Sequence, residues 1–309
     1  MKISVVIPFF NEEKQIPITV DALVPVLASL GCDFEAVLVD DGSSDGTWAA
    51  LRAACTADAR LRAIRFSRNF GKEAALCAAL DAADGDAVVV MDGDLQHPPA
   101  VIPEMVRLWR DEGYEVVEGV KSSRGRESLG SRLNAALFYS LFKRLSGFDL
   151  ENASDFKLLD RRVVEEWRRL GERDTFFRGL SAWLGFRRAK VPFEVADRKA
   201  GKSKWSPFKL IRLSITAITS FSAMPLQIVS VLGGLLLVGS LALGIQTLVK
   251  WAQGSAASGF TTVILLLLLI GGCIMLSLGL IGIYLARIFD QVKGRPRYVV
   301  AEDTRRRGR

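Results

Sequence analysis

Residues 87–99 read AVVVMDGDLQHPP, an apolar run that ends in two carboxylates separated by one glycine. Five apolar residues in a row, bounded by turn residues, are typical of a buried strand. Asp92 and Asp94 would then lie close together at the carboxyl end of that strand, where two negative charges repel unless a cation or a proton is shared. Oxygen ligands of this kind suit Mg²⁺ or Mn²⁺, which would in turn bridge a diphosphate.

Similar apolar runs alternate with helix-like stretches through the first 120 residues. The other runs cover residues 3–9, 36–39, 61–66 and 115–120, and the helix-like stretches cover 16–30, 47–57 and 72–83. This alternation predicts a largely parallel α/β sheet, whose ligands lie at the carboxyl ends of the strands.

Two more of these strand ends carry polar residues. The first strand is followed by PFFNEE at residues 8–13, without a G-x-G-x-x-G fingerprint, which argues against a dehydrogenase-type dinucleotide fold. The second strand is followed by DDGSSDGT at residues 40–47, which on its own could be merely a turn and a helix cap.

Composition excludes several classes of protein. Half of the 309 residues are hydrophobic and the net charge is +7, but residues 1–120 hold 10 basic and 20 acidic side chains while residues 121–220 hold 22 basic and 11 acidic ones. This argues against intrinsic disorder, a collagen-like repeat and a simple soluble globule. The four cysteines are widely separated and form no C-x-x-C pair, so neither a disulfide framework nor a zinc site is indicated.

Two long uncharged stretches predict membrane spans. Residues 226–249 and 260–286 carry no charge over 24 and 27 positions, and a span needs roughly 20 apolar residues. Basic residues flank the pair on both outer sides, whereas the link 250–259 holds only Lys250. By the positive-inside rule, both flanks are cytoplasmic and the link faces outward.

The remaining boundaries follow from the spans. Residues 1–205 would form a cytoplasmic domain and residues 287–309 a basic cytoplasmic tail. Residues 206–225 would form an interfacial helix, because four apolar side chains recur there at helical spacing: Phe208, Ile211, Ile215 and Ile218. A second amphipathic stretch, residues 133–145, could lie on the membrane or pack on the domain.

Together these motifs resemble the family 2 glycosyltransferases of the GT-A fold, and more narrowly the polyprenyl-phosphate glycosyltransferases. That group includes dolichyl-phosphate mannose synthases and bacterial undecaprenyl-phosphate glucosyltransferases. The resemblance rests on the order of VVIPFFNEE from Val5, DDGSSDGT from Asp40, RNFGKEAAL from Arg68, MDGDLQHPP from Met91, RGRES from Arg124, SDFKLLDR from Ser154, FRGLSAWLGF from Phe177, AGKSKW from Ala200 and SFSAMPL from Ser220, followed by the two spans.

The resemblance implies a fold and a nucleotide site. The fold would be a Rossmann-like GT-A domain, a mixed but mostly parallel sheet with helices on both faces, plus juxtamembrane amphipathic helices and a C-terminal two-helix transmembrane hairpin. Asp41 would accept a hydrogen bond from the nucleobase imide and Glu12 would bind the ribose. The other nucleotide-binding residues would be Pro8 and Phe10 at the base, Gly71 and Lys72 at its far side, and Asp92 with Gly93.

The resemblance also implies a metal site and a catalytic carboxylate. Asp94 would be the principal ligand of Mg²⁺ or Mn²⁺, with Asp92 and Gln96 completing the coordination. Asp155 resembles the residue often proposed as general base in this family. A phosphate monoester has a second pKa of about 6 and is already largely ionised at pH 7, so Asp155 would either act as a base or orient the acceptor, the sugar or the metal. His97 precedes two prolines and is expected to be a turn residue.

A lipid phosphate acceptor explains the basic second region. Its dianionic headgroup at the membrane surface requires fixed positive charge from the protein. Each basic residue could instead belong to a solvated face or attract anionic lipids. The candidates for binding the acceptor phosphate are Lys121, Arg124, Arg126, Arg132, Arg198, Lys202 and Lys204, with Ser128 and Ser203 as neutral donors.

The predicted reaction is an inverting, in-line transfer of a sugar from a nucleotide donor to a polyprenyl phosphate in the bacterial inner membrane. The resemblance favours UDP-glucose and undecaprenyl phosphate, and leaves UDP-N-acetylglucosamine, GDP-mannose and an aminoarabinose donor open. An inactive lipid-binding scaffold is the alternative from another class, whereas a processive polysaccharide synthase would carry a Q-x-x-R-W motif and more spans. No nucleic-acid partner is expected. Glycines in the spans would let helices pack within one chain or in a homo-oligomer.

Overall fold

The structure is a computed structural model that describes residues 1–121, 154–172, 176–194, 224–253 and 260–305. The chain divides into two compact units. The first comprises Met1–Trp205 together with Arg295–Arg309, and the second comprises Ser206–Gly294.

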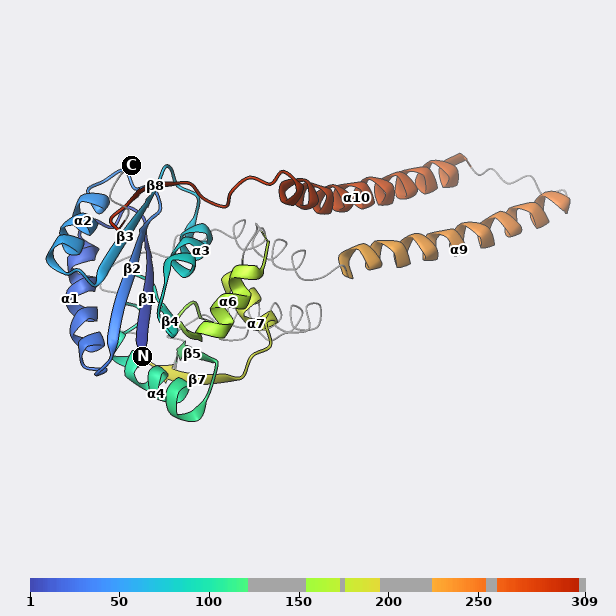
Figure 1. Cartoon of the computed structure of the whole chain (residues 1–309). Coiled ribbons are helices and arrows are strands. Elements are labelled where there is room, and N and C mark those ends of the chain that lie inside the picture. The colour runs from blue at the N-terminus through green and yellow to red at the C-terminus, as the bar shows by residue number, and fades with distance from the viewer. Residues whose placement is uncertain (122–153, 173–175, 195–223, 254–259, 306–309) are drawn as a thin grey trace. The chain divides into compact units, whose positions relative to one another are not determined.

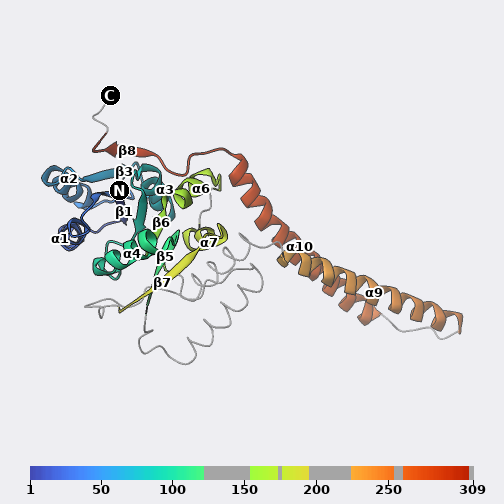
Figure 2. The ribbon, with the colours of Figure 1, turned by 60° about the horizontal axis from the view of Figure 1, so that its bottom comes forward.

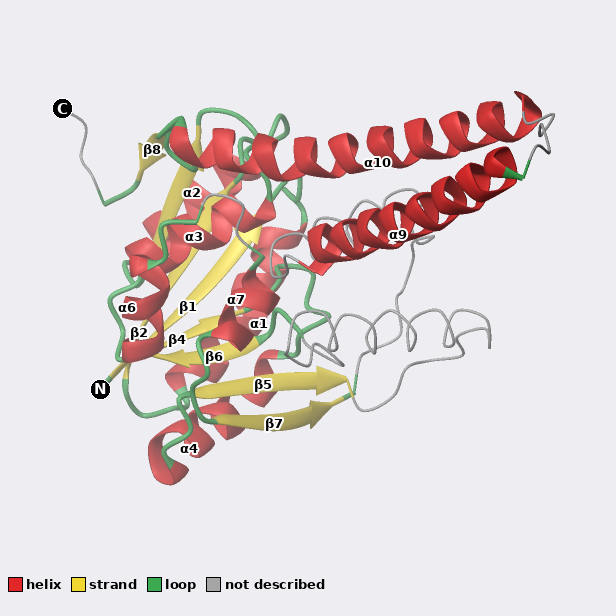
Figure 3. Ribbon diagram, turned by 90° about the vertical axis from the view of Figure 1, so that its right-hand side faces the viewer, coloured by secondary structure: helices red, strands yellow, loops and turns green. Residues whose placement is uncertain are grey.

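An eight-stranded mixed sheet forms the centre of the first unit, in the order β7-β5-β6-β4-β1-β2-β3-β8. Pairing is parallel between β1 and β2, β1 and β4, β2 and β3, and β5 and β7, and antiparallel at β6 and β8 (Figure 3). The strands are β1 (Lys2–Phe9), β2 (Asp33–Asp40), β3 (Leu61–Phe66), β4 (Ala87–Val90), β5 (Val116–Lys121), β6 (Lys157–Asp160), β7 (Arg188–Phe193) and β8 (Val300–Asp303). The predicted mixed, mostly parallel sheet is confirmed.

Helices cover both faces of this sheet, so its central strands are buried on both sides. Figure 1 shows α1 and α2 on one side of the central strands and α3 and α6 on the other. This double burial explains the continuous apolar runs, because every side chain from Val5 to Ile7 is fully buried. The helical elements are α1 (Gln15–Ala28), α2 (Thr47–Ala57), α3 (Lys72–Ala82), η1 (Pro99–Val101), α4 (Ile102–Glu112), α6 (Arg161–Arg169) and α7 (Phe177–Trp183).

Strand pairing brings the loops that follow β1, β2 and β4 to one edge of the sheet. Phe9 lies opposite Asp40 and Val6 lies opposite Val90 in the parallel register. The Asp41 backbone N–H continues this pairing by donating to the Phe9 carbonyl at 3.0 Å. Polar residues that are about 30 to 80 positions apart in the sequence, after different strands, therefore become neighbours.

An edge strand of the sheet comes from the far end of the chain. β8 pairs antiparallel with β3 (Figure 2). Arg62 donates to both carboxylate oxygens of Asp303, from Nε at 3.1 Å and from Nη2 at 2.8 Å. The Tyr298 ring stacks on Phe66 with 5.0 Å between ring centroids. The sequence predicted only a basic tail over residues 287–309, because this short polar strand lacks an apolar run.

The second unit contains two long apolar helices, α9 (Met224–Ala252) and α10 (Phe260–Val292). Within them, Leu226–Lys250 and Leu266–Val292 have mean hydropathies of 2.4 and 2.6 and are long enough to cross a membrane. The two helices border a shared groove that both line with small and apolar side chains, among them Gly233 on α9 and Cys273 on α10. The amphipathic stretch predicted at 133–145 lies outside the described residues, as does the part 206–223 of the interfacial helix predicted at 206–225, whose last two residues belong to α9.

Replacing Asp303 with Ala should lower the free energy of unfolding by about 2 kcal/mol, because Arg62 is only 15% exposed and loses both of its carboxylate acceptors. Thermal unfolding of the full chain, followed by tryptophan fluorescence, measures this change. Glu166→Ala is the matched control, since its exposed ion pair with Arg169 should contribute at most about 0.5 kcal/mol. Equal effects of the two substitutions would contradict a stabilising role for the β8 contact.

Candidate active site

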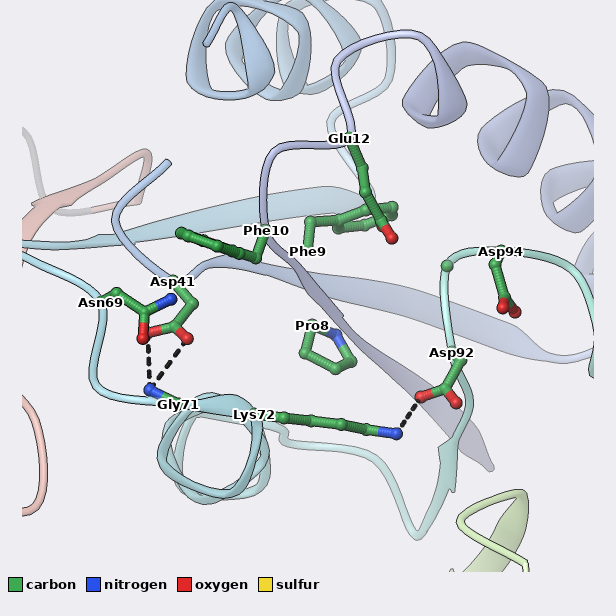
Figure 4. A pocket seen from close by; sticks show the side chains of 11 residues that line it. Pro8, Phe9, Phe10, Glu12, Asp41, Asn69, Gly71, Lys72, Asp92 and Asp94 are labelled. Carbon is green, nitrogen blue, oxygen red and sulfur yellow. Dashed lines mark hydrogen bonds and ion pairs between the residues drawn. The ribbon is translucent and has the colours of Figure 1, made fainter. Parts of the chain in front are cut away.

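A pocket of about 330 Å³ opens at the edge of the sheet where β1, β2 and β4 end (Figure 4). It contains every residue predicted to bind the nucleotide, together with Asp94 and two residues that the sequence did not single out, Phe9 and Asn69. Its complete lining is Pro8, Phe9, Phe10, Glu12, Asp41, Asn69, Gly71, Lys72, Asp92, Gly93 and Asp94. The structure thus brings these side chains together, and their binding roles remain predictions.

Asp41 organises one wall of the pocket. Its carboxylate accepts the backbone N–H of Phe70 at 2.7 Å and that of Gly71 at 2.9 Å (Figure 4). Burial raises the pKa of Asp41, and the two backbone donors oppose that rise. A carboxylate offers about four acceptor positions, so Asp41 retains acceptor capacity for a ligand while it fixes the loop that precedes α3.

Two loops at the pocket hold non-glycine residues in left-handed backbone conformations. Asn11, after β1, has φ 54°, and Leu95, after β4, has φ 57°. Asparagine tolerates positive φ, whereas leucine rarely adopts it, so the loop after β4 stores conformational strain that its surroundings must offset. Gly93 is required for packing, because a Cβ atom there would lie 2.4 Å from a ring carbon of Phe9. The Asp92-Gly93-Asp94 turn therefore sits directly on the buried end of β1.

Lys72 provides the cation nearest to this turn. Its ammonium lies 2.6 Å from Asp92 Oδ1 (Figure 4). It also lies 2.8 Å from Asp155 Oδ2, so it bridges the carboxylate that follows β4 and the one that precedes β6. The nearby charges of Asp155 and Asp92 raise the pKa of Lys72 against the effect of burial. Lys72 was predicted to lie at the far side of the base. The structure also places its ammonium next to the acidic turn, as a counter-charge to Asp92.

Asp155 lies behind this lysine and does not line the pocket. Arg178 on α7 donates to both of its oxygens, at 2.7 Å to Oδ1 and 3.0 Å to Oδ2. Although burial alone would raise it, the pKa of Asp155 is held well below its usual range by Arg178 and Lys72. Asp155 is therefore ionised, and both of its oxygens accept hydrogen bonds from cationic side chains. Arg178 was not singled out by the sequence, although it lies within the FRGLSAWLGF motif.

His97 lies in the bend after β4, as predicted, and its buried ring links two loops. The Asp92 backbone N–H donates to His97 Nδ1 at 3.1 Å, and His97 Nε2 lies 3.4 Å from Ser154 Oγ. The ring is 6% exposed and stacks on Phe156, and burial lowers its pKa, so the neutral ring carries its proton on Nε2. His97 thereby connects the acidic turn after β4 to the segment before β6.

The acidic residues suit a divalent cation whose remaining ligands are the oxygens of a diphosphate. Among the described residues no group of three His, Cys, Asp or Glu side chains has metal-binding geometry. Mg²⁺ commonly uses only one or two carboxylates plus substrate phosphates. Burial, followed by the charges of Asp94 and Asp92, raises the pKa of Glu12 to about 7. That rise reveals excess negative charge which a cation would relieve. Gln96 donates its backbone N–H to Asp94, and its side chain does not line the pocket.

Most residues predicted to bind the acceptor phosphate cannot be placed. Lys121 is exposed at the end of β5. The others, Arg124, Arg126, Ser128, Arg132, Arg198, Lys202, Ser203 and Lys204, lie outside the described residues.

The fold and the acidic pocket at its strand ends define an α/β transferase of the glycosyltransferase type. The model of glycosyl transferase family 2 matches residues 4–168, and the chain belongs to this family. The resemblance drawn from the sequence motifs is confirmed, and the protein is a hexosyltransferase.

Relatives match the chain over nearly its whole length. The glycosyltransferase YkcC of Bacillus subtilis (strain 168) is 40% identical over 299 residues, which are 96% of this chain and 92% of the relative. The SfII prophage-derived bactoprenol glucosyl transferase of Shigella flexneri is 36% identical over 99% of both chains. Among solved structures, glucosyl-3-phosphoglycerate synthase from Mycobacterium tuberculosis with UDP is 25% identical, covers 71% of this chain and 79% of its own, and has a TM-score of 0.47.

The affinity for Mn²⁺ in the presence of UDP should rise up to about tenfold between pH 6 and pH 8. A Glu12 pKa of about 7 means that the residue is mostly protonated at pH 6, and a cation must then displace that proton. Titration calorimetry at pH 6, 7 and 8 measures the slope. In Glu12→Gln the affinity for Mn²⁺ should change with pH only as far as the UDP phosphate titrates. In the control Glu112→Gln, at the exposed end of α4, the pH dependence should equal that of the wild type. An equal slope in wild type and Glu12→Gln would refute the coupling.

Replacing His97 with Ala should weaken the binding of UDP with Mn²⁺ by about tenfold, because the Asp92 backbone N–H loses its acceptor. His97→Asn places an oxygen near the position of Nδ1 and should restore most of the affinity. Calorimetry provides the affinity, and thermal unfolding separates it from the loss of stacking on Phe156. If His97→Asn and His97→Ala were equally impaired while both remained folded, the hydrogen bond to Asp92 would not explain the effect.

Proposed function

We propose that the protein transfers glucose from UDP-glucose to undecaprenyl phosphate, with inversion at the anomeric carbon. The observation that carries this proposal is the 36% identity to a bactoprenol glucosyl transferase over 99% of both chains. That match extends beyond the nucleotide-binding half, through the basic region and both apolar helices. It therefore supports a lipid acceptor more strongly than a match to the family domain alone would.

The pocket accounts for donor binding. Asp41 and Glu12 line the pocket and would recognise the base and the ribose of a nucleoside, and Asp92 and Asp94, which line it as well, would face the diphosphate. Bound Mg²⁺ or Mn²⁺, held by Asp94 and Asp92, would neutralise charge on the leaving diphosphate. Lys72 adds a fixed positive charge beside Asp92. These residues orient the donor so that its anomeric carbon faces the acceptor.

The acceptor requires little activation. A phosphate monoester is largely dianionic at pH 7, since its second pKa is about 6, and its oxygen attacks without losing a proton. The protein's contribution is then to bind the anion and align it. We assign this role to Lys121 and to the basic residues predicted at 124–132 and 198–204, which combine charge with neutral serine donors.

The membrane supplies the acceptor. We propose that α9 and α10 span the bacterial inner membrane, with both flanks and the catalytic domain on the cytoplasmic side, where the basic residues lie. A lipid phosphate and a soluble nucleotide sugar meet only at this surface. The anchor therefore serves the reaction by confining the enzyme to the plane of its substrate.

Nucleotide release by the purified full chain in detergent tests this function. We expect UDP release from UDP-glucose that requires undecaprenyl phosphate and a divalent metal. Release should fall at least about a hundredfold in Asp94→Asn and remain unchanged in Asp111→Asn, an exposed aspartate on α4. The panel includes UDP-N-acetylglucosamine, GDP-mannose and a UDP-aminoarabinose donor, and activity with one of these would replace glucose. Binding of UDP without lipid-dependent release from any donor would contradict the transferase and favour a lipid-binding scaffold.

A further inference from the structure

Asp155 is placed poorly for taking a proton from an acceptor. Its side chain is 8% exposed and does not line the pocket. Three donor atoms from Lys72 and Arg178 contact its two oxygens at 2.7 to 3.0 Å. A general base needs an accessible oxygen within hydrogen-bonding reach of the proton it removes. Lys72, which lines the pocket, donates to one of the oxygens of this carboxylate.

The same contacts place two cations side by side. Lys72 Nζ and Arg178 Nη2 both donate to Asp155 Oδ2, at 2.8 and 3.0 Å, so the two positively charged atoms lie no more than about 6 Å apart. Each of these side chains is 43% exposed, although Asp155 itself is buried. Two accessible cations at this spacing match the oxygens of a phosphate group, which Arg and Lys bind with charge-assisted hydrogen bonds.

Arg178 is held on a rigid support. Glu73, the residue after Lys72 on α3, accepts the backbone N–H of Phe177 at 2.9 Å at the start of α7. The buried Lys157 donates to Ser181 Oγ at 2.8 Å, one turn further along the same helix. The guanidinium is therefore positioned by the backbone of α7 as well as by Asp155. This is the preorganisation that a specific anion site requires.

We propose that Asp155 is a positioning residue, and that Arg178, aligned by it next to Lys72, binds a phosphate group of a substrate. This inference rests on the proposed function and identifies how that reaction handles its anions. The phosphate belongs either to the donor diphosphate, which lies near Lys72 and Asp92, or to the lipid acceptor. Both the donor diphosphate and the acceptor phosphate present negatively charged phosphate oxygens. Steady-state kinetics distinguishes the two.

The test compares Arg178→Gln, Arg178→Lys and Asp155→Asn in the full chain. Arg178→Gln should raise the KM of one substrate by about tenfold to a hundredfold, with Arg178→Lys intermediate. A higher KM for UDP-glucose, accompanied by weaker UDP binding, shows that Arg178 binds the donor diphosphate. A higher KM for undecaprenyl phosphate alone shows that it binds the acceptor phosphate. Asp155→Asn should raise the same KM and leave the shape of the kcat profile from pH 5.5 to 8.5 unchanged. Arg169→Gln, an exposed arginine of α6, is the matched control.

Two results would overturn the proposal. One is a loss of kcat in Asp155→Asn with unchanged KM values and a lost acidic limb of the pH profile, as expected for a general base. The other is Arg178→Gln with wild-type KM values for both substrates. If the wild type released no nucleotide from any donor, the proposed function would fail separately. The affinities of Arg178→Gln for UDP and for farnesyl phosphate, measured by calorimetry, would then decide the phosphate site by themselves. Thermal unfolding shows that each variant is folded.

Discussion

The site depends on the repulsion among carboxylates that the sheet gathers at one edge. Asp92 and Asp94 follow β4, Glu12 follows β1, and Asp155 precedes β6. The ammonium of Lys72, shared by Asp92 and Asp155, offsets part of this negative charge. Glu12 and Asp94 have no such cation among their contacts in the described residues, and burial, followed by the charges of Asp94 and Asp92, raises the pKa of Glu12. A pocket with this charge distribution favours a cationic ligand on one side and phosphate oxygens beside it.

Local signals in the sequence predicted the first half of the fold well. Each central strand is a run of apolar residues because helices cover both faces of the sheet, and such runs can be recognised without a structure. The polar loops after β1, β2 and β4 were predicted to meet because parallel strands end at one edge. For the same reason the residues predicted to bind the nucleotide, from Pro8 to Gly93, were recognised as a group by reading strand ends together with the family resemblance, and the structure places them around one pocket.

Contacts between distant elements could not be read in this way. Arg178 meets Asp155 across 23 positions and His97 meets Ser154 across 57, and neither partner carries a periodic signal that indicates the other. His97 was interpreted as a turn residue because two prolines follow it, although the structure buries its ring on Phe156. Antiparallel strands such as β6 and β8 were missed or left unassigned for a related reason. Each is four residues long, and pairing rather than composition defines it.

The position of β8 in the chain sets the order in which the protein can be completed. Asp303 lies 241 residues after its partner Arg62, and the two apolar helices are encoded between them. A ribosome releases the nucleotide-binding segment long before it has made the strand that covers the edge of β3. During that interval β3 presents unpaired backbone groups, and the sheet closes only after both apolar helices have left the ribosome. Completion of the sheet therefore requires that both apolar helices have already been synthesised.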